Sequence, residues 1–359
     1  MKYNWQQEKW PEFEFDRSEI EKLEKEFLIR SGHLGGLWQC LNSENKEHIK
    51  ISILADEALK TSEIEGEIFN RDSVRSSIQK HFGLKTNRRV EPGEYGVAKM
   101  MVDTFQSYDA KLSEEKLFYW HTLICNGRDD LGVVGGYRKH EEAMQIVSGQ
   151  IDRPKVHFEA PPSKNVPKEM QNFVKWIQED SSGILVKSAI AHLYFTSIHP
   201  FEDGNGRVGR AISEYTISHS LGKPSFIMLS TQVEEQKKQY YDMLEIYSKT
   251  LKISGWILWF GRVILDAQEY SIKLFEHILA KSVLFGKIGG DINNRQEKVL
   301  LRMFDAGVEG FAGGLSAKNY ATISKAPPAT TTRDLADLVK KGVLTRTGER
   351  KTTRYFLNI

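Results

Sequence analysis

The sequence predicts a mainly α-helical protein, with an all-helical core interrupted by one β-hairpin and a winged helix-turn-helix module at the C-terminus. Three observations lead to this prediction. Apolar residues recur at helical spacing through most of the 359 residues. Residues 144–162 break that spacing with β-prone pieces around a glycine-containing turn, which favours a hairpin. Residues 293–359 hold three helical segments followed by two β-prone pieces that flank Gly348.

Composition indicates a globular protein of a reducing compartment. Hydrophobic residues make up 40% and aromatic residues 11% of the chain, with only ten prolines, which excludes a disordered chain. No apolar run approaches 18 residues, and the N-terminus lacks the apolar stretch of a signal peptide. We therefore expect no membrane span and a cytoplasmic location. The two cysteines, Cys40 and Cys125, make neither a disulfide framework nor a metal site.

Helical periodicity is clearest in five stretches. In the first of them, Ile51 and Ala58 lie on one apolar stripe. A helix before Pro200 and another that Gly222 ends flank the loop that begins at His199. The five stretches are 49–67, 186–201, 205–222, 235–249 and 255–279. They predict a helical protein rather than one built on a large sheet.

The C-terminal module differs in charge from the rest of the chain. Residues 293–359 hold 12 Lys+Arg and 6 Asp+Glu, a local +6, so the chain total of +2 leaves −4 for the remainder. A glycine-containing stretch at 286–294 is typical of a linker into this module. We expect residues 330–333 (TTTR) to begin a recognition helix and DNA to be a candidate partner, although such modules often bind proteins instead.

The segment 199–210, HPFEDGNGRVGR, contains the residues that carry chemistry. Amides at a helix start near Asn205 lack intrahelical partners, and Gly204 and Gly206 leave them open, which predicts an anion site suited to phosphate. Arg207 and Arg210 share a helical face and suit a polyphosphate. No Walker loop is present, and an EF-hand alignment lacks the required acids. A helix-capping turn with incidental charge is the alternative.

Two further side chains of this segment suit catalysis. His199 lies at the loop entrance, is expected to titrate near neutrality, and is a candidate general base. Asp203 is a candidate ligand for Mg²⁺ that bridges phosphates. His192, one helix earlier, is expected to be a hydrogen-bonded core histidine.

The same twelve residues resemble the complete signature of the Fic family, HPFx(D/E)GNGRxxR. The resemblance implies a Fic core at 112–266 that moves AMP from ATP to a Ser, Thr or Tyr hydroxyl of a protein, with the hairpin as a flap that aligns the target chain. It implies that His199 is the base, Asp203 the Mg²⁺ ligand, Asn205 a contact of the α-phosphate, and Phe201 a structural residue. It further implies an anion hole at Gly204 and Gly206, a β-phosphate contact by Arg207, a γ-phosphate contact by Arg210, and a nucleoside contact by Tyr240 and Tyr241. For the two tyrosines a core position is the alternative.

A second motif, residues 61–66 (TSEIEG), resembles the family's inhibitory helix motif, (S/T)xxxE(G/N), at Thr61, Glu65 and Gly66. Glu65 also continues the apolar stripe by heptad spacing, and a carboxylate on a buried face needs a cation. We expect that cation to be Arg210, which would deprive the γ-phosphate of its partner and inhibit the enzyme in cis. The alternative is a solvated Glu65 at a fraying helix end.

These features divide the chain into an N-terminal helical region with the inhibitory helix (1–111), the catalytic core (112–266), a helix and linker (267–292) and the winged-helix module (293–359). The N-terminal WQQEKWPEFEFD resembles bacterial Fic proteins with such a module. Expected partners are ATP with Mg²⁺, a protein target and the chain itself through self-modification, with a homodimer as a further possibility. The alternatives are a nucleotide-sensing DNA-binding regulator, AMP removal, or transfer from another donor.

Overall fold

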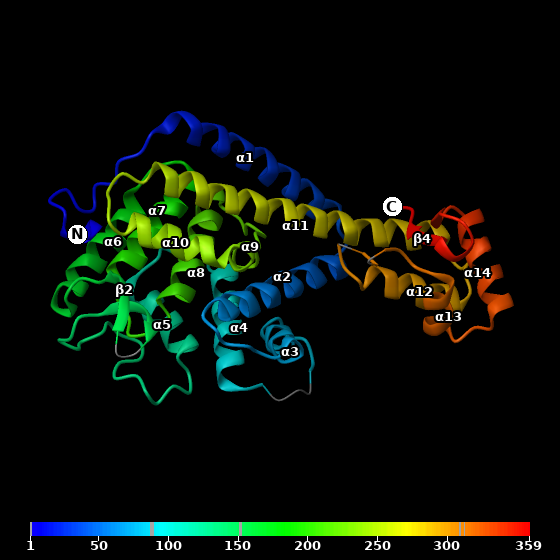
Figure 1. The fold of residues 1–359 in the computed structure, drawn as a ribbon, viewed down its shortest axis with the longest axis horizontal. Helices are drawn as coiled ribbons and strands as arrows, with labels where there is room; N and C mark the ends of the chain where they lie inside the picture. The colour runs from blue at the N-terminus through cyan, green and yellow to red at the C-terminus, as the bar shows by residue number, and fades with distance from the viewer. Residues whose placement is uncertain (1, 87–89, 151–152, 309, 312) are drawn as a thin grey trace. The chain divides into compact units, whose positions relative to one another are not determined.

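Helices dominate the computed structural model, which describes every residue except 1, 87–89, 151–152, 309 and 312 (Figure 1). Two two-stranded sheets are the regular β-structure of the described residues. The helices are α1 (Arg17–Cys40), α2 (Ser43–Ile64), α3 (Arg71–His81), α4 (Pro92–Gln106), α5 (Glu114–Ile124), α6 (Val166–Glu179), α7 (Ile184–Ile198), α8 (Asn205–Leu221), α9 (Leu229–Glu235), α10 (Lys237–Tyr247), α11 (Ser254–Ile288), α12 (Asn294–Phe304), α13 (Ala317–Ser324) and α14 (Pro328–Lys340). The strands are β1 (Gln145–Gln150), β2 (Arg153–Glu159), β3 (Leu344–Thr347) and β4 (Arg354–Leu357). The mainly helical class predicted from the sequence is confirmed.

The chain forms two compact units. Residues 1–33 and 47–269 make up the first unit, and residues 34–46 and 270–359 make up the second. The N-terminal helical region, apart from residues 34–46, thus shares one unit with the expected catalytic core. None of the helices in the described parts of the chain is long and apolar enough to cross a bilayer.

The first unit is organised around α7 and α8, the two helices that flank the charged loop. Most residues of α7 are buried, as expected for a helix that is apolar on every side. Phe195 and Ile198 of α7 and Val208 and Ile212 of α8 belong to one hydrophobic cluster. Because this cluster holds both helices, the loop between them has fixed ends.

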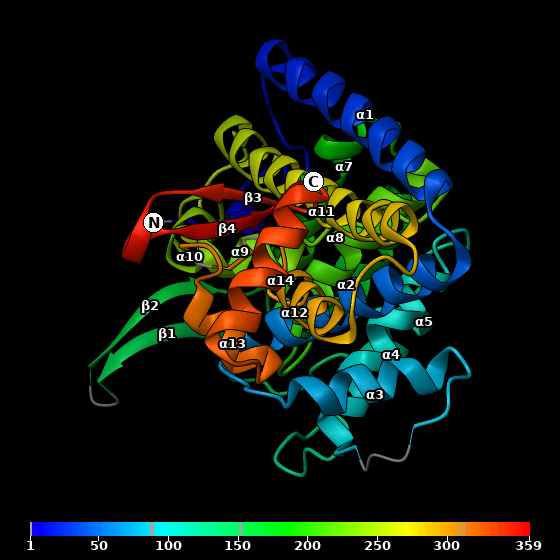
Figure 2. The same cartoon turned by 90° about the vertical axis from the view of Figure 1, so that its right-hand side faces the viewer.

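The hairpin expected at 144–162 is present as β1 and β2 (Figure 2). Its strands are antiparallel, and an irregularity in register falls between Ile146 and Val147. Its expected glycine-containing turn includes residues 151–152, which lie outside the described residues. The strands pair only with each other, so each has a free edge within the described part of the chain.

The second unit ends in the order of elements expected for a winged helix. Helices α12, α13 and α14 precede the β3–β4 hairpin, and Leu315 forms a bridge with Tyr355 of β4. Asp334 of α14 accepts hydrogen bonds from Asn293, Arg295 and Tyr320, which joins the three helices. The expected linker at 286–294 is helical up to Ile288, since α11 extends further than its apolar pattern indicated.

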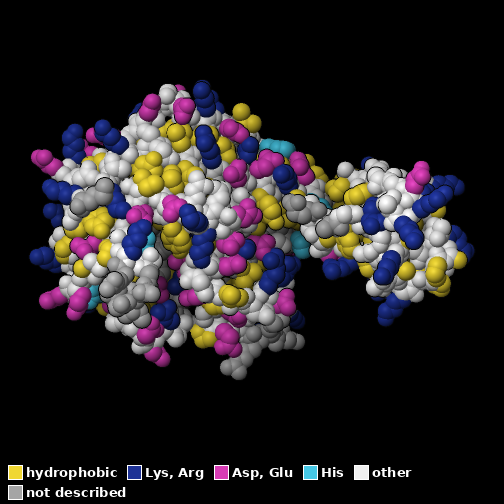
Figure 3. Space-filling view, in the orientation of Figure 1, with side chains coloured by type: hydrophobic (Ala, Val, Ile, Leu, Met, Phe, Trp, Pro, Cys, Tyr) yellow, Lys and Arg dark blue, Asp and Glu magenta, His cyan; other side chains and the backbone are white. Residues whose placement is uncertain are grey.

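The surface of this module is basic (Figure 3). Exposed cationic side chains come from its helices and its hairpin: Arg302, Lys318, Arg333, Lys340, Arg346, Arg350 and Lys351. The expected start of the recognition helix differs, because α14 already begins at Pro328. Thr331 is buried, whereas Thr332 and Arg333 face solvent, so only part of the expected TTTR segment is available to a partner.

Candidate active site

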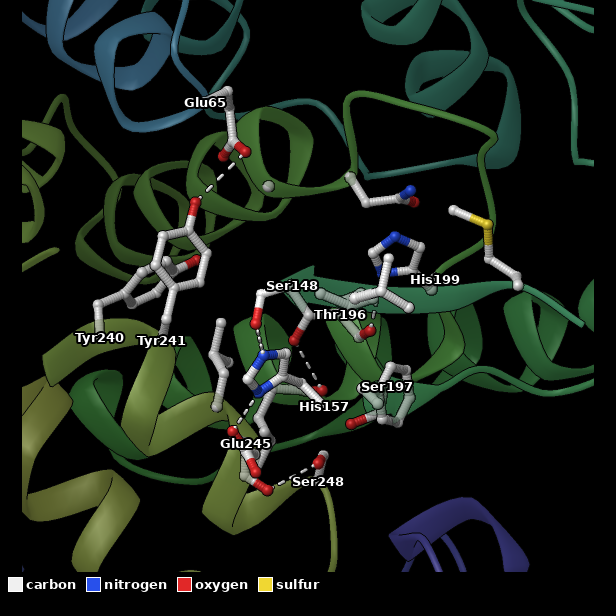
Figure 4. Close-up of a pocket in the computed structure, with 18 of the residues that line it drawn as sticks. Glu65, Ser148, His157, Thr196, Ser197, His199, Tyr240, Tyr241, Glu245 and Ser248 are labelled. Carbon is white, nitrogen blue, oxygen red and sulfur yellow. Dashed lines mark hydrogen bonds and ion pairs between the residues drawn. The ribbon is translucent and has the colours of Figure 1, made fainter. Parts of the chain in front are cut away.

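The α7–α8 loop forms one wall of a cavity of about 580 Å³ (Figure 4). His199 caps α7 in the left-handed conformation, with φ 51°, and Gly204 precedes α8 with φ 78°. These two positions turn the chain sharply, so that the start of α8 faces the cavity. The wall consists of His199, Glu202, Asp203, Gly204, Asn205 and Gly206, and strands β1 and β2 and helix α10 supply much of the remainder. The loop residues predicted to surround an anion are therefore together at one site.

Asn205 holds the loop in this shape. Its side-chain oxygen accepts from the Phe201 amide at 3.0 Å, and its nitrogen donates to the Phe201 carbonyl at 2.8 Å. Phe201 is fully buried, as expected, and stacks on the His121 ring with 4.1 Å between centroids. Both polar atoms of the Asn205 side chain are thus engaged by the loop itself. Its predicted contact with the α-phosphate stays a prediction.

Arg138, which the sequence analysis did not identify, holds the loop from the other side. Its Nε donates to the His199 carbonyl at 2.8 Å, and its Nη2 donates to the Pro161 carbonyl at the base of the hairpin. Its backbone amide also donates to the Pro200 carbonyl. A 2% exposed arginine that satisfies backbone carbonyls fixes the loop directly at the candidate base.

His199 is arranged to accept a proton. Its Nδ1 lies 3.3 Å from the Thr196 carbonyl, which favours the tautomer with the proton on Nδ1 and a free lone pair on Nε2. Burial is the main reason that the pKa of His199 is lowered to about 4. This lowered pKa differs from the expectation that the imidazole titrates near neutrality, and it leaves His199 neutral at pH 7.

Asp203 is a charged carboxylate with its partners in place. Its Oδ1 accepts from the Gly204 amide at 2.6 Å, and its Oδ2 lies 2.7 Å from Nη1 of Arg128. Burial acts to raise the pKa of Asp203, but these bonds and the charges of Arg207 and Arg128 lower it below its usual value. The described residues contain no cluster of three metal-ligating side chains. Asp203 would thus hold Mg²⁺ only together with oxygens that a ligand brings, as is usual for Mg²⁺ on nucleotides.

The predicted pair between Glu65 and Arg210 is present. Nη2 of Arg210 lies 2.8 Å from Oε1 of Glu65 and donates to the Thr61 carbonyl at 2.7 Å. Nε of Arg210 donates to the Thr61 hydroxyl at 2.8 Å. Arg210 is fully buried, and its Nη1 has no hydrogen-bond partner among the described residues. Thr61 and Glu65 thus hold the same guanidinium group, one through its hydroxyl and carbonyl and the other through its carboxylate.

Glu65 reaches Arg210 from just beyond the end of α2, not from its buried stripe. The helix stops at Ile64, and Gly66 adopts φ 88°, a left-handed conformation that glycine accepts without a steric cost. The Glu65 side chain is 27% exposed, so the expectation of a buried helical face is wrong. The Glu65 carboxylate lies where a side chain on Gly206 would begin, directly against the first turn of α8. It therefore fills the space predicted for an anion.

A second carboxylate of the same segment, Glu67, was missed by the sequence analysis. Its Oε2 lies 2.6 Å from Nη1 of Arg207, whose side chain is 2% exposed. The Nε of Arg207 has no partner among the described residues. Glu67 lies two residues beyond Glu65 in an irregular segment, so no periodicity pointed to it. Both arginines predicted to bind phosphate are thus paired with acids that follow α2.

Tyr240 and Tyr241 both line the cavity but differ in exposure (Figure 4). Tyr240 is buried, and its hydroxyl pairs with Nε2 of His192 at 2.8 Å. His192 is fully buried and also pairs with Ser213, so its expected place in the core is confirmed. Tyr241 is 40% exposed, and its hydroxyl lies 3.5 Å from Oε2 of Glu65.

Comparisons with known proteins agree with this geometry. Residues 111–217 match the model of the Fic/DOC family, and residues 3–84 match a domain of unknown function, DUF4172. A probable protein adenylyltransferase of Aquifex aeolicus is 30% identical over 109 residues, which is 30% of this chain and 30% of that protein. The protein adenylyltransferase Fic of Drosophila mojavensis is 33% identical over 109 residues, 30% of this chain and 20% of that protein. The match thus spans less than a third of these relatives.

Solved structures share the fold over more of the chain. A Fic family protein from Desulfovibrio desulfuricans superposes with a TM-score of 0.53 at 20% identity, covering 93% of this chain and 95% of the other. Fic-1 of C. elegans superposes with a TM-score of 0.52 at 18% identity, covering 73% of this chain and 74% of that one. Identity at this level establishes the shared fold alone.

Proposed function

We propose that this chain, in which residues 111–217 form a Fic/DOC domain, is a protein adenylyltransferase that moves AMP from Mg²⁺-bound ATP to a protein hydroxyl. One observation carries the proposal: the neutral imidazole of His199 lines the same cavity as the start of α8. A base and an anion site in one cavity suit attack by a hydroxyl on a phosphate. The relatives named above as adenylyltransferases support the same reaction.

In this reaction the hydroxyl oxygen attacks the α-phosphorus, and pyrophosphate leaves. The backbone amides at Gly204 to Gly206 would bind phosphate oxygens, aided by the positive end of the helix dipole. Asp203 would hold the Mg²⁺ that neutralises the leaving pyrophosphate. Arg207 would bind the β-phosphate and Arg210 the γ-phosphate through Nε and Nη1 respectively, nitrogens that have no partner among the residues the structure describes. Catalysis is then mainly positioning and electrostatic stabilisation.

His199 would take the proton of the target hydroxyl at its free Nε2. A base with a pKa near 4 is weak, so the transfer would occur late, when the attacking oxygen has become acidic. General base catalysis of this kind contributes roughly 10²–10⁴-fold. Arg138 would keep the imidazole at the right place by holding its backbone carbonyl.

The β1–β2 hairpin would align the target chain. Its edges are unpaired within the described residues, and Ile146, Val147 and Val156 are exposed large side chains of these strands. A target segment that added as a further strand would gain main-chain hydrogen bonds without a demand on its sequence. Its hydroxyl-bearing residue would then be presented to the cavity.

We further propose that the structure represents an inhibited state. The Glu65 carboxylate lies against Gly206 and on Arg210, and Glu67 pairs with Arg207. A triphosphate would compete with these carboxylates for the same guanidinium groups and the same space. Inhibition therefore would not need a partner, because the segment that follows α2 supplies both acids in cis.

The test is AMP transfer by three proteins: wild type, Glu65→Gly and the double variant Glu65→Gly/His199→Ala. Each would be incubated with Mg²⁺ and ATP labelled at the α-phosphate, with a cell lysate as a source of targets. The expected result is weak labelling of lysate proteins by wild type, strong labelling of them by Glu65→Gly and almost none by the double variant. Equal labelling by Glu65→Gly and the double variant would refute His199 as the base. A panel of ATP, CTP, GTP and UTP in a thermal-shift assay would test the nucleotide.

The basic surface of residues 293–359 favours DNA as a second ligand (Figure 3). Exposed arginines and lysines on α14 and the β3–β4 hairpin are suited to phosphate contacts. A gel shift of duplex DNA by the wild-type protein at low salt would support this role if the Arg346→Gln/Arg350→Gln variant does not shift the DNA. If the DNA does not shift at low salt, the module does not bind DNA, and a protein becomes its expected partner. Removal of AMP from a modified target is the other activity to assay.

A further inference from the structure

A chain of three polar side chains crosses the cavity away from His199. Ser148 of β1 lies 2.6 Å from Nε2 of His157 on β2, measured from its hydroxyl oxygen. Nδ1 of His157 in turn lies 2.5 Å from Oε2 of Glu245 on α10. All three residues line the cavity that His199 and the start of α8 also line (Figure 4).

The hydrogen bonds define the direction in which a proton would move. Glu245 can only accept while it is ionised, so the imidazole proton belongs on Nδ1 and the lone pair of Nε2 faces the Ser148 hydroxyl. Hydrogen bonds from His157 and Lys249 lower the pKa of Glu245 to about 2, which keeps it charged. A hydroxyl, an imidazole and a carboxylate in this order form the arrangement that activates a serine as a nucleophile.

A purely structural role accounts for only part of this hydrogen-bonded row of Ser148, His157 and Glu245. A contact that fastened the hairpin to α10 would be complete with His157 and Glu245, whose side chains are 24% and 26% exposed. Ser148 is exposed and adds a hydroxyl on the cavity side of that contact. The site therefore presents an oriented, accessible oxygen beside the proposed nucleotide site.

We propose that Ser148 is an acceptor of AMP within the chain itself, activated by His157 and Glu245. This inference rests on the proposed transfer reaction. The Ser148 oxygen forms a bond to the α-phosphorus of ATP, the bond from that phosphorus to the bridging oxygen breaks, and pyrophosphate leaves with the electron pair. The serine proton passes to Nε2 of His157, and Glu245 stabilises the resulting imidazolium.

Modification of Ser148 would also change the site. The AMP group would occupy part of the 580 Å³ cavity and would remove the hydroxyl proton that His157 binds. Binding of a further ATP molecule would then be hindered, so that self-modification would limit the enzyme after release from inhibition.

The experiment uses the full chain in the Glu65→Gly background with Mg²⁺ and ATP. Intact-mass and peptide mass spectrometry would locate AMP in this protein and with Ser148→Ala, Ser148→Thr, His157→Gln or His199→Ala added. We expect AMP on Ser148, its loss in Ser148→Ala and its retention at position 148 in Ser148→Thr. Loss of the base in His157→Gln should slow this labelling about 100-fold. His199→Ala, which removes the proposed base for target proteins, should slow labelling of Ser148 less than His157→Gln does, because the serine proton passes to His157.

The outcomes separate this inference from the proposed function. If AMP appears on target proteins or on other residues, and at an unchanged rate in Ser148→Ala, Ser148 is not the acceptor. The proposed transferase activity would still be supported by that result. Labelling of Ser148 that needs His199 and not His157 would refute the activation mechanism. AMP on no protein at all would refute both proposals. Diisopropyl fluorophosphate, which needs no ATP chemistry, should modify Ser148 in wild type and not in His157→Gln; equal reaction of both would also count against activation.

Discussion

The guanidinium of Arg207 is paired at 2.6 Å with the carboxylate of Glu67, two residues after the Glu65 that pairs with Arg210. The segment after α2 thus occupies both arginines proposed to bind the triphosphate. Each carboxylate reaches its arginine because Gly66 ends the helix in a left-handed conformation between them. The proposed inhibition would therefore use a double contact, and the two acids are separable by substitution.

Substitution of Glu67 should raise AMP transfer further in a protein that already lacks the Glu65 carboxylate. We expect Glu67→Gln to raise the affinity for ATP modestly and Glu65→Gly/Glu67→Gln to exceed Glu65→Gly in AMP transfer by about five- to ten-fold, the effect of roughly 1 kcal/mol from one ion pair. Calorimetric titration with a non-hydrolysable ATP analogue would measure the affinity. Glu63→Gln, which alters an exposed acid paired with Lys60, is the matched control. A double variant no more active than Glu65→Gly would show that Glu67 does not inhibit.

Thr61 should stabilise the inhibited state through its hydroxyl. Thr61→Val keeps the shape but leaves Nε of the buried Arg210 without an acceptor, at a cost of about 1–3 kcal/mol in the free energy of unfolding. Urea denaturation would measure this cost, and AMP transfer should rise because Arg210 is less firmly held. Thr61→Ser retains the hydroxyl and should behave as wild type. Unchanged stability in Thr61→Val would contradict the contact.

Arg128 should compete with Mg²⁺ for Asp203. Its guanidinium lies 2.7 Å from the carboxylate and is also paired with Asp130. We expect Arg128→Gln to lower the Mg²⁺ concentration at half-maximal activity by about two- to five-fold, since a part-exposed ion pair contributes under ~1 kcal/mol. Asp130→Asn, which leaves the contact with Asp203, is the control and should not lower it. A raised midpoint in Arg128→Gln would mean that Arg128 helps to bind the metal-bound nucleotide.

Buried histidines should make the fold sensitive to acid. Burial lowers the pKa of His192 to about 3 and that of His121 to about 4, against 6.5 in an unfolded chain. The unfolded state then binds more protons, so stability is fully present above pH 6.5 and declines as the pH falls towards 4. Between pH 7 and pH 4, protonation of His192 should lower the free energy of unfolding by about 3 kcal/mol. Denaturation at pH 7 and pH 4 would measure it.

The slope of stability against pH identifies the histidine responsible. His192→Asn should be less stable than wild type at pH 7 but should lose about 3 kcal/mol less on acidification. An equal slope in wild type and His192→Asn would show that His192 is not neutral when buried.

Most of the fold could be predicted from local pattern. The helices at 186–201 and 205–222 are present as α7 and α8, and the hairpin at 144–162 is present as β1 and β2. Boundaries were less accurate: α11 extends into the expected linker, and α2 stops just before Glu65. Apolar spacing reports which side of a helix is buried, whereas helix ends depend on caps and on contacts outside the element.

The sequence by itself determined the resemblance of 199–210 to the Fic signature, the mainly helical class and the pairing of Glu65 with Arg210. The first two inferences use neighbours along the chain or a continuous motif, and the third combines two separate motifs, 61–66 and 199–210, that resemble motifs of one family. Only the tertiary structure decided that Glu67 pairs with Arg207, that Arg138 holds the His199 carbonyl, and that Ser148, His157 and Glu245 meet. These contacts join residues up to 140 positions apart. No local spacing encodes them, because burial and packing of whole helices bring such side chains together.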